Sequence, residues 1–293
     1  MKILVTGGSG FIGRNIRESY LNEKYTIVTP SHRDFELTDQ EAVDEHFKRN
    51  QYDAVIHGAG KPGHRNAKDP FGILYNNSRM FFNLIRNADS FGKLIIIGSG
   101  AAYDMRNYVP KMKEEYFGTY MPADEHGYNK YICGKFIEKS DKVIDLRVFG
   151  IFGKYEDYAI RFISNAICKT LFDLPITIKQ NRKFDYIYIN DLLPVLEYFI
   201  ENETKYTAYN VTPDESEELL ELAKMVREIS AKDIPINISQ DGMGLEYSGS
   251  NARLRDEFTG WKMTPHYDAI RSLYAWYADR RDELDRSLLL VDK

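Results

Sequence analysis

Two pairs of side chains in the segment DEHGYNKYICGK (residues 124–135) are spaced for proton transfer. His126 lies four residues before Lys130, and Tyr131 lies four residues before Lys135. Residues four apart share one face of a helix, so in each pair the ammonium could lower the pKa of the imidazole or phenol beside it. Tyr131 would lie roughly 140° round the helix from His126, so the two pairs cannot both face one site.

A second chemical pattern is the glycine-rich stretch ILVTGGSGFIGRNI (residues 3–16), which joins a predicted strand to a predicted helix. Gly7 would permit a tight turn, Gly10 would let a pyrophosphate approach the backbone, and Gly13 would let the helix pack closely on the strand. The helix N-terminus would present amides and a positive dipole end to the phosphates. The stretch predicts dinucleotide binding, with a tight turn that binds no ligand as the simpler alternative. The expected contacts are Thr6, Gly7, Gly10, Phe11, Ile12, Gly13 and Arg14.

The end of the next predicted strand, TIVTPSHRDF (residues 26–35), bears on which dinucleotide is bound. An NAD enzyme usually has an acid there for the ribose hydroxyls, but no acid precedes Ser31. Arg33, with Arg14 as a second candidate, could instead pair with the 2′-phosphate of NADP. NADP is therefore the preferred cofactor, while Asp34 beside Arg33 leaves NAD open.

Composition limits the classes of function. The chain has 293 residues and a net charge of −5, which argues against nucleic-acid binding. No run approaches membrane-spanning length, and the start MKILVTGGSG indicates a first strand, not a signal peptide. Two cysteines are too few for a disulfide framework and favour a reducing cytoplasm. The six histidines show no paired ligand spacing, so no metal site is predicted.

The elements that must position these motifs follow a regular rhythm in the first part of the chain. Helical patterns at 11–22, 39–49, 71–91 and 126–139 alternate with short β-branched runs, which are KILVT, YTIVTP, AVIHGAG, KLIIIGSG and VIDLRVFG. The alternation predicts an α/β fold with right-handed crossovers and a doubly wound parallel sheet.

The later part of the chain is less regular and predicts a second, smaller α/β domain. Residues 216–229 have an amphipathic helical pattern, DYIYIND (185–191) alternates like a strand, and Thr264 would cap a last helix. The expected plan is a cofactor domain at 1–154, to which 183–202 returns, a substrate domain made mainly of 155–293, and a cleft between them.

In order and spacing, six stretches resemble the extended short-chain dehydrogenases/reductases of the NAD-dependent epimerase/dehydratase family: TGGSGFIG, VIHGAGKPG, IIIGSGAAYD, GYNKYICGKFIE, FDYIYINDL and YNVTPDESEELLELA. The resemblance covers essentially the whole chain. Within the family, Lys61 and the run GYNKYICGKFIE look most like GDP-fucose synthase and related nucleotide-sugar 4-ketoreductases. It implies a Rossmann domain that binds NAD(P), with Gly58, Ala59 and Gly60 among the contacts, and a C-terminal domain that holds a nucleoside-diphosphate sugar.

The resemblance also implies a catalytic set, which is a Ser or Thr at a strand end followed by Tyr-x-x-x-Lys on the next helix. Ser99 matches the hydroxyl residue. In GDP-fucose synthases a lysine and a glutamate lie nine and twelve residues beyond the tyrosine, and Lys135 and Glu138 stand at those distances from His126. This register places His126 where the tyrosine belongs, with Lys130 as the lysine, and is preferred over Tyr131 with Lys135.

A histidine at this position would change the chemistry. Lys130 and a cationic nicotinamide should lower the pKa of His126 below about 6.5 and leave the imidazole neutral. A neutral imidazole could accept a proton during alcohol oxidation or donate one weakly during reduction.

The residues after Ser99 bear on the reaction type. Gly100 and Ala101 stand where sugar 4,6-dehydratases have an Asp-Glu pair, so dehydration is not expected. Ala101 also replaces the cysteine acid/base of GDP-fucose synthase, which puts that enzyme's two-step chemistry in doubt here. Plain ketone reduction, or C4 epimerisation through a keto intermediate, needs neither group.

The substrate side is less defined. Expected contacts are Lys61, Tyr103, Arg161 as a diphosphate ligand, and Lys179. Relatives often dimerise through the Tyr-Lys helix, which makes a homodimer possible. The expected function is that of a cytoplasmic NAD(P)-dependent 4-ketoreductase or epimerase of a nucleoside-diphosphate sugar, in surface-glycan precursor synthesis. The alternative is an impaired or non-catalytic binding member of the same fold.

Overall fold

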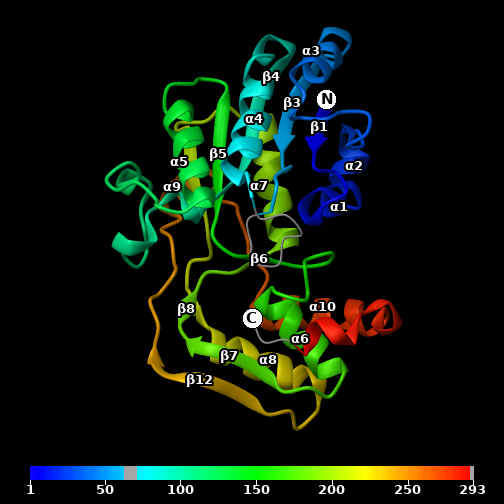
Figure 1. Ribbon diagram of the computed structural model, residues 1–293, viewed down its shortest axis with the longest axis vertical. Helices are drawn as coiled ribbons and strands as arrows, with labels where there is room; N and C mark the ends of the chain where they lie inside the picture. Colours follow the sequence, from blue (N-terminus) through cyan, green and yellow to red (C-terminus); the bar gives the residue numbers. More distant parts are fainter. Residues whose placement is uncertain (63–70, 291–293) are drawn as a thin grey trace.

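The computed structural model describes residues 1–62 and 71–290, and a six-stranded sheet is its largest element (Figure 1). The strand order is β10-β5-β4-β3-β1-β2, and all neighbours are parallel. The strands are β1 (Lys2–Thr6), β2 (Thr26–Val28), β3 (Tyr52–His57), β4 (Phe91–Ser99), β5 (Val143–Val148) and β10 (Ala208–Val211). The predicted parallel, doubly wound α/β architecture is therefore confirmed.

Helices cover both faces of this sheet, because its strands carry apolar side chains on both faces. Leu4 packs in the cluster beneath α3, α4 and α5, whereas Ile3 and Val5 pack in the cluster that contains α1 and α7. The helices are α1 (Phe11–Arg17), α2 (Leu21–Lys24), α3 (Gln40–Arg49), α4 (Ile73–Ile85), α5 (Glu125–Ile137) and α7 (Ile189–Glu201).

A smaller part of the chain forms pairs of short strands with helices (Figure 1). β7 pairs with β12 and β6 with β9 in parallel, and β8 pairs with β11 antiparallel. The elements are β6 (Ile151–Phe152), α6 (Phe162–Leu171), β7 (Ile176–Asn181), β8 (Lys183–Phe184), β9 (Ile187–Tyr188), β11 (Glu217–Glu218), α8 (Leu219–Ser230), β12 (Ile236–Met243), α9 (Ala252–Glu257) and α10 (His266–Ala278). Single 3-10 turns are η1 (Ala88–Ser90), η2 (Gly100–Ala102), η3 (Met105–Asn107), η4 (Glu114–Tyr116), η5 (Arg281–Glu283) and η6 (Arg286–Leu289).

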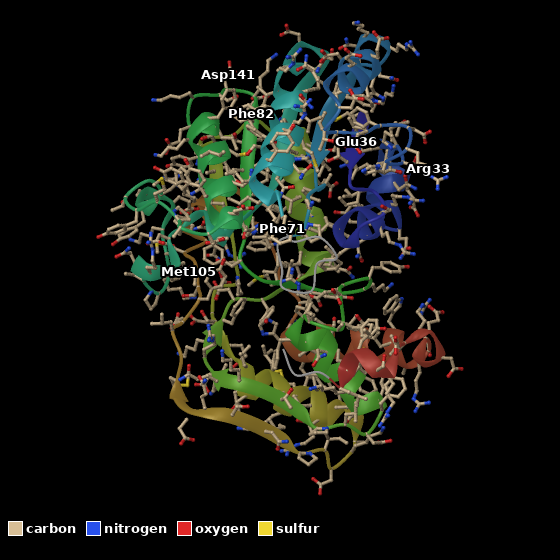
Figure 2. The ribbon with its side chains drawn as sticks, in the orientation of Figure 1. Arg33, Glu36, Phe71, Phe82, Met105 and Asp141 are labelled. Atoms are coloured by element: carbon tan, nitrogen blue, oxygen red, sulfur yellow. The ribbon has the colours of Figure 1, made fainter. Side chains whose placement is uncertain are left out.

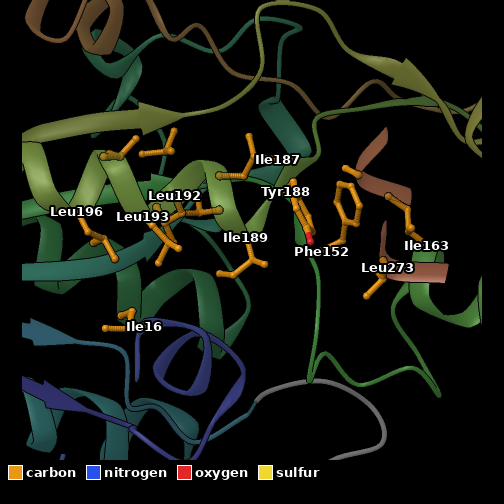
Figure 3. Packing of buried hydrophobic residues seen from close by; sticks show 14 of the residues in the cluster. Ile16, Phe152, Ile163, Ile187, Tyr188, Ile189, Leu192, Leu193, Leu196 and Leu273 are labelled. Carbon is orange, nitrogen blue, oxygen red and sulfur yellow. The ribbon is translucent and has the colours of Figure 1, made fainter. Parts of the chain in front are cut away.

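One hydrophobic core joins the two parts of the molecule (Figure 3). Leu192 and Leu196 of α7 pack towards Ile16 of α1, while Phe152, Ile163 and Leu273 continue the same cluster into the smaller part. Because one buried cluster contains residues of both, the sheet and the smaller part form a continuous body. None of the helices within 1–62 and 71–290 is long and apolar enough to cross a membrane.

Several predicted boundaries were wrong for local reasons. The helix expected at 11–22 is broken because the Ser19 hydroxyl donates to the carbonyl of Ile16 (2.7 Å) and accepts the amide of Leu21 (3.2 Å). The helix expected at 71–91 ends at Ile85, where the Asn87 amide donates to the Asn83 carbonyl.

Two predictions for elements later in the chain were also wrong. In DYIYIND only Ile187–Tyr188 is a strand, because α7 begins at Ile189 and follows the helical spacing of its leucines. Thr264 does not cap α10, since its hydroxyl donates to a carboxylate oxygen of Asp191 (2.7 Å).

Candidate active site

Two adjoining cavities lie along the carboxyl ends of the parallel strands, where ligands of open α/β sheets bind. The first, of about 610 Å3, contains the strand ends at His57 and Ser99 and reaches Arg161 in the smaller part. The second, of about 490 Å3, contains Thr6 and the glycine loop. Both share residues 58–61 in their walls, so a ligand could extend from one into the other.

The glycine loop shapes the second cavity. Gly7 has a φ of +74°, which lies in the left-handed region that favours glycine. Thr6 fixes the neighbouring strand end, since its hydroxyl hydrogen-bonds to Nδ1 of His57 (2.8 Å) and accepts the Ala59 amide (3.3 Å). Of the predicted contacts, Thr6, Gly7 and Gly10 line the second cavity, Phe11 and Ile12 line the first, and Gly58, Ala59 and Gly60 line both.

The two arginines expected at the cofactor phosphate lie outside both cavities. Arg14 is exposed, and its guanidinium lies 3.9 Å from the ring centroid of Tyr155. Arg33 is exposed in the loop after β2 and points away from the body in Figure 2. Its neighbour His32 lines the second cavity together with Glu36, and their side chains are 2.6 Å apart. Sequence reasoning missed Glu36 because no motif marks it.

The pair His126 and Lys130 is brought to the first cavity with Ser99. Asp124 caps α5 by accepting the Gly127 amide (2.8 Å), so His126 lies in the first helical turn and Lys130 one turn later. The Lys130 ammonium lies 3.4 Å from the carbonyl of Ile97, next to the strand end.

The other pair lies on a different face of α5. The Tyr131 ring packs on Phe117 with centroids 5.4 Å apart, and Lys135 forms an ion pair with Glu138 (3.0 Å). Neither Tyr131 nor Lys135 contributes to the wall of either cavity. The geometry thus separates the two pairs, and only one of them shares a cavity with Ser99.

His126 lies in an environment that disfavours its charged form. Burial lowers its pKa most, and the positive charge of Lys130 lowers it further. Lys130 was an expected cause of this lowering, but burial, which was not expected, is the larger one. Within the described residues, Nδ1 of His126 is buried and has no hydrogen-bond partner. A neutral imidazole with an unused nitrogen is suited to contact a ligand.

Of the three cationic side chains expected at the substrate, two line the first cavity and one does not. Lys61 lines both cavities, and its backbone is held by Asn77, whose side chain accepts the Lys61 amide (2.6 Å). Arg161 lines the first cavity just before α6. Lys179 is exposed on β7 and lies outside both cavities.

Tyr103, an expected substrate contact, is 2% exposed and does not line either cavity. Its hydroxyl donates to the side-chain oxygen of Asn210 (2.8 Å) and accepts from the buried guanidinium of Arg147 (2.9 Å). Both hydrogen-bonding roles of the phenol are therefore used inside the protein, and none remains for a substrate.

Glu156 is a lining residue that sequence reasoning missed. It is 7% exposed, lies in the wall of the first cavity, and accepts the Ser164 hydroxyl (2.6 Å). Burial raises the pKa of its carboxyl to about 8. No motif marks this position, since it lies in an irregular loop where Tyr155 has a φ of +70°.

Within the part of the chain that the structure describes, no three His, Cys, Asp or Glu side chains cluster in a way that could hold a metal ion. Cys133 and Cys168 are buried free thiols. One of the six histidines, His64, lies outside the residues that the structure describes.

The sequence model of the NAD dependent epimerase/dehydratase family matches residues 3–212. The chain is 25% identical to GDP-L-colitose synthase of Yersinia pseudotuberculosis over 228 residues, which cover 70% of this chain and 74% of that protein. It is 26% identical to UDP-glucose 4-epimerase of Bacillus subtilis over 288 residues, with 80% and 84% covered.

Solved structures show the same fold. GDP-mannoheptose C4 reductase from Campylobacter jejuni, determined with NADP bound, superposes with a TM-score of 0.80 at 22% sequence identity. The superposition covers 94% of this chain and 98% of that one.

Proposed function

Because this chain belongs to the NAD dependent epimerase/dehydratase family, we propose that it reduces the C4 ketone of a nucleoside-diphosphate sugar with NADPH. The observation that carries the proposal is that Ser99, His126 and Lys130 share one cavity, which adjoins the cavity of the glycine loop. Reduction at this carbon is supported by GDP-mannoheptose C4 reductase, which has the same fold.

The residues present fit such a cofactor, since the glycine loop leaves a cavity at the start of α1 and Nδ1 of His126 is buried without a partner in the described chain. When bound, NADPH supplies the hydride. Ser99 would donate a hydrogen bond to the carbonyl oxygen and polarise it, while keeping its own proton. His126 hydrogen-bonds the same oxygen, and its protonated form delivers the proton. Lys130 would contact the cofactor ribose, and its charge adds to the effect of burial in lowering the pKa of His126.

Gly100 and Ala101 follow Ser99 without an acidic side chain, which supports reduction over dehydration. Epimerisation through a keto intermediate uses the same three residues and is the neighbouring activity. The proposed setting is the cytoplasmic synthesis of surface-glycan precursors, with which the two free thiols agree.

Absorbance of NADPH at 340 nm tests the proposal. The protein is mixed with NADPH and a panel of nucleotide-linked 4-keto sugars, and oxidation of NADPH is expected with at least one of them. If NADPH binds tightly but neither the protein nor its His126→Tyr variant oxidises it, the protein is a non-catalytic binding member of the fold. The non-catalytic alternative is favoured by one observation, which is that the pKa of His126 is lowered from the ordinary histidine value.

Cofactor choice gives a first prediction. Arg33 follows His32 at the rim of the second cavity, and no acid ends β2, so we propose that Arg33 moves onto the 2′-phosphate of NADPH. Arg33→Ala should raise KM for NADPH about tenfold, because one charge-assisted contact with the 2′-phosphate is lost. KM for NADH should stay unchanged, because NADH has no such phosphate. Arg14→Ala serves as the matched variant, since Arg14 packs on Tyr155. An equal rise for both cofactors would exclude phosphate recognition by Arg33.

We also propose a homodimer. An apolar groove between α4 and α5 has Leu74, Tyr75, Phe82 and Ile132 in its walls, and Tyr75 is 63% exposed. Figure 2 shows Phe82 on this outer face. A second copy placing the same helices against the groove would cover these side chains. Sedimentation at micromolar concentration distinguishes the dimer from a 34.0 kDa monomer.

A further inference from the structure

A buried histidine connects the ends of two neighbouring strands at the place where the two cavities adjoin. Thr6 ends β1 and His57 ends β3, and the two residues are partners in the parallel register. The Thr6 hydroxyl lies 2.8 Å from Nδ1 of His57. Thr6 lines the second cavity and His57 lines the first, so this hydrogen bond joins the wall of one cavity to the wall of the other.

The contacts of Thr6 indicate which nitrogen of His57 carries the proton. Burial, and to a smaller extent the charge of Lys130, lower the pKa of His57 to about 3, so its imidazole is neutral near pH 7. The Thr6 oxygen accepts the amide of Ala59 (3.3 Å), which leaves the hydroxyl proton for Nδ1 of His57. A neutral imidazole has one nitrogen that accepts and one that donates. Since Nδ1 accepts from Thr6, the ring proton lies on Nε2.

Nε2 of His57 opens to the first cavity. No hydrogen bond joins it to a residue within 1–62 and 71–290. In the same part of the chain, the buried side-chain polar atoms without a partner are Nδ1 of His126 and the hydroxyl of Tyr277. Nε2 of His57 lacks a partner but is neither of these, so it is accessible although the residue is only 7% exposed. The first cavity, which His57 lines, is the space that it reaches.

The surroundings of His57 indicate which part of a dinucleotide it would meet. On one side, Thr6 leads directly into the glycine loop that begins at Gly7. On the other side, His57 pairs with Ile96 of β4, and the carbonyl of the next residue, Ile97, lies 3.4 Å from the Lys130 ammonium. A dinucleotide that extends from the glycine loop towards Ser99 would pass His57 between its phosphates and its nicotinamide ring.

We propose that His57 is a cofactor-binding residue, whose Nε2–H donates to a hydroxyl oxygen of the nicotinamide ribose of NADPH. The proposal rests on the cofactor proposed above. Thr6 holds the imidazole in the tautomer that donates, so one hydrogen bond connects the start of the glycine loop with the nicotinamide half of the cofactor. Because the imidazole stays neutral, this contact is the same at pH 6 and at pH 8, in contrast to a proton donated by His126.

The test measures binding by calorimetric titration with two ligands. NADPH contains the nicotinamide ribose, whereas adenosine 2′,5′-bisphosphate contains only the adenosine half. His57→Asn keeps an amide near the position of Nδ1, where Thr6 can bind it, but has no group at the position of Nε2. It should weaken NADPH binding about tenfold, because one hydrogen bond is lost. Binding of adenosine 2′,5′-bisphosphate should stay within twofold of the parent.

His57→Gln is the matched variant, because its side-chain amide can place an N–H near the position of Nε2. It should bind NADPH within threefold of the parent. A purely structural role predicts the opposite order, since Asn and not Gln keeps the contact with Thr6. Unchanged NADPH binding by His57→Asn, an equal loss for both ligands, or a loss in His57→Gln as large as in His57→Asn overturns the proposal.

Nitrogen-15 NMR of the parent protein gives a measurement that does not depend on how a variant folds. The ring of His57 should carry its proton on Nε2, and this signal should shift with NADPH but not with adenosine 2′,5′-bisphosphate. A proton on Nδ1 overturns the proposal. If NADPH binds but no nucleotide sugar is reduced, the reductase proposal fails, and the titrations still decide the role of His57. If the parent does not bind NADPH, the inference falls with the choice of cofactor.

Discussion

His126→Tyr is expected to increase the rate of ketone reduction about a hundredfold at pH 8, within the usual range for a general acid. Even an unshifted imidazole is only about 3% protonated at that pH, and burial and Lys130 lower the pKa of His126 further. The parent site therefore lacks its proton donor for most of the time. A phenol in the same helical turn keeps its proton at pH 8 and can donate it.

The pH profiles provide the measurement. Reduction by the parent should fall tenfold for each pH unit above the lowered pKa of His126, because only the imidazolium donates. The profile of His126→Tyr should be flat between pH 6 and 8. Tyr131→Phe is the matched control and should not change either profile, since Tyr131 packs against Phe117 on another face of α5. Activity that survives His126→Phe and disappears in Tyr131→Phe would show that the wrong pair was chosen.

Gly13→Ala is expected to weaken NADPH binding more than a hundredfold. A β-carbon there would collide with the carbonyl oxygen of Gly7 and come within 2.6 Å of the Cα of Gly8. Both neighbours are backbone atoms, so no side-chain rotation relieves the overlap and the phosphate loop itself must shift. The loop amides then lose the positions from which they would bind the pyrophosphate.

Calorimetric titration with NADPH measures this loss, and far-ultraviolet circular dichroism shows that the variant is folded at the titration temperature. Gly260→Ala is the control, since Gly260 lies outside both cavities and its β-carbon would have no neighbour closer than 3.5 Å, an ordinary contact distance. Binding by folded Gly13→Ala within threefold of the parent would mean that this loop does not hold the dinucleotide.

The sequence was sufficient for the parallel sheet, because that depends on periodicity. The choice of His126 over Tyr131 came from the register of the family resemblance and stays a prediction. Asp124 and the four-residue repeat on α5 are enough to bring His126 and Lys130 to one side. Local spacing failed where a single side chain redirects the backbone, as Ser19 does between α1 and α2.

Contacts between distant segments could not be predicted in this way. Tyr103 was an expected substrate contact, yet Arg147 and Asn210 use its hydroxyl in the interior. Glu156 carries no motif, yet it lies in the wall of the first cavity beside residues of the sheet. One sequence has no signal for such encounters, since they depend on how the later part of the chain packs on the sheet.

The position of β10 beside β5 sets the order in which this protein can complete its folding during synthesis. β5 ends at Val148, but the strand that pairs with it begins at Ala208, after α6 and α7 have been made. Until then the nascent chain exposes the open edge of an apolar strand, which is a template for aggregation. Closing so long a loop is slow compared with local pairing. A chain stopped before residue 208 would keep this edge permanently unpaired and would also lose Asn210 from the Tyr103 hydroxyl. The first 150 residues hold the glycine loop and the Ser99 strand end, yet we expect them to aggregate when they are expressed alone.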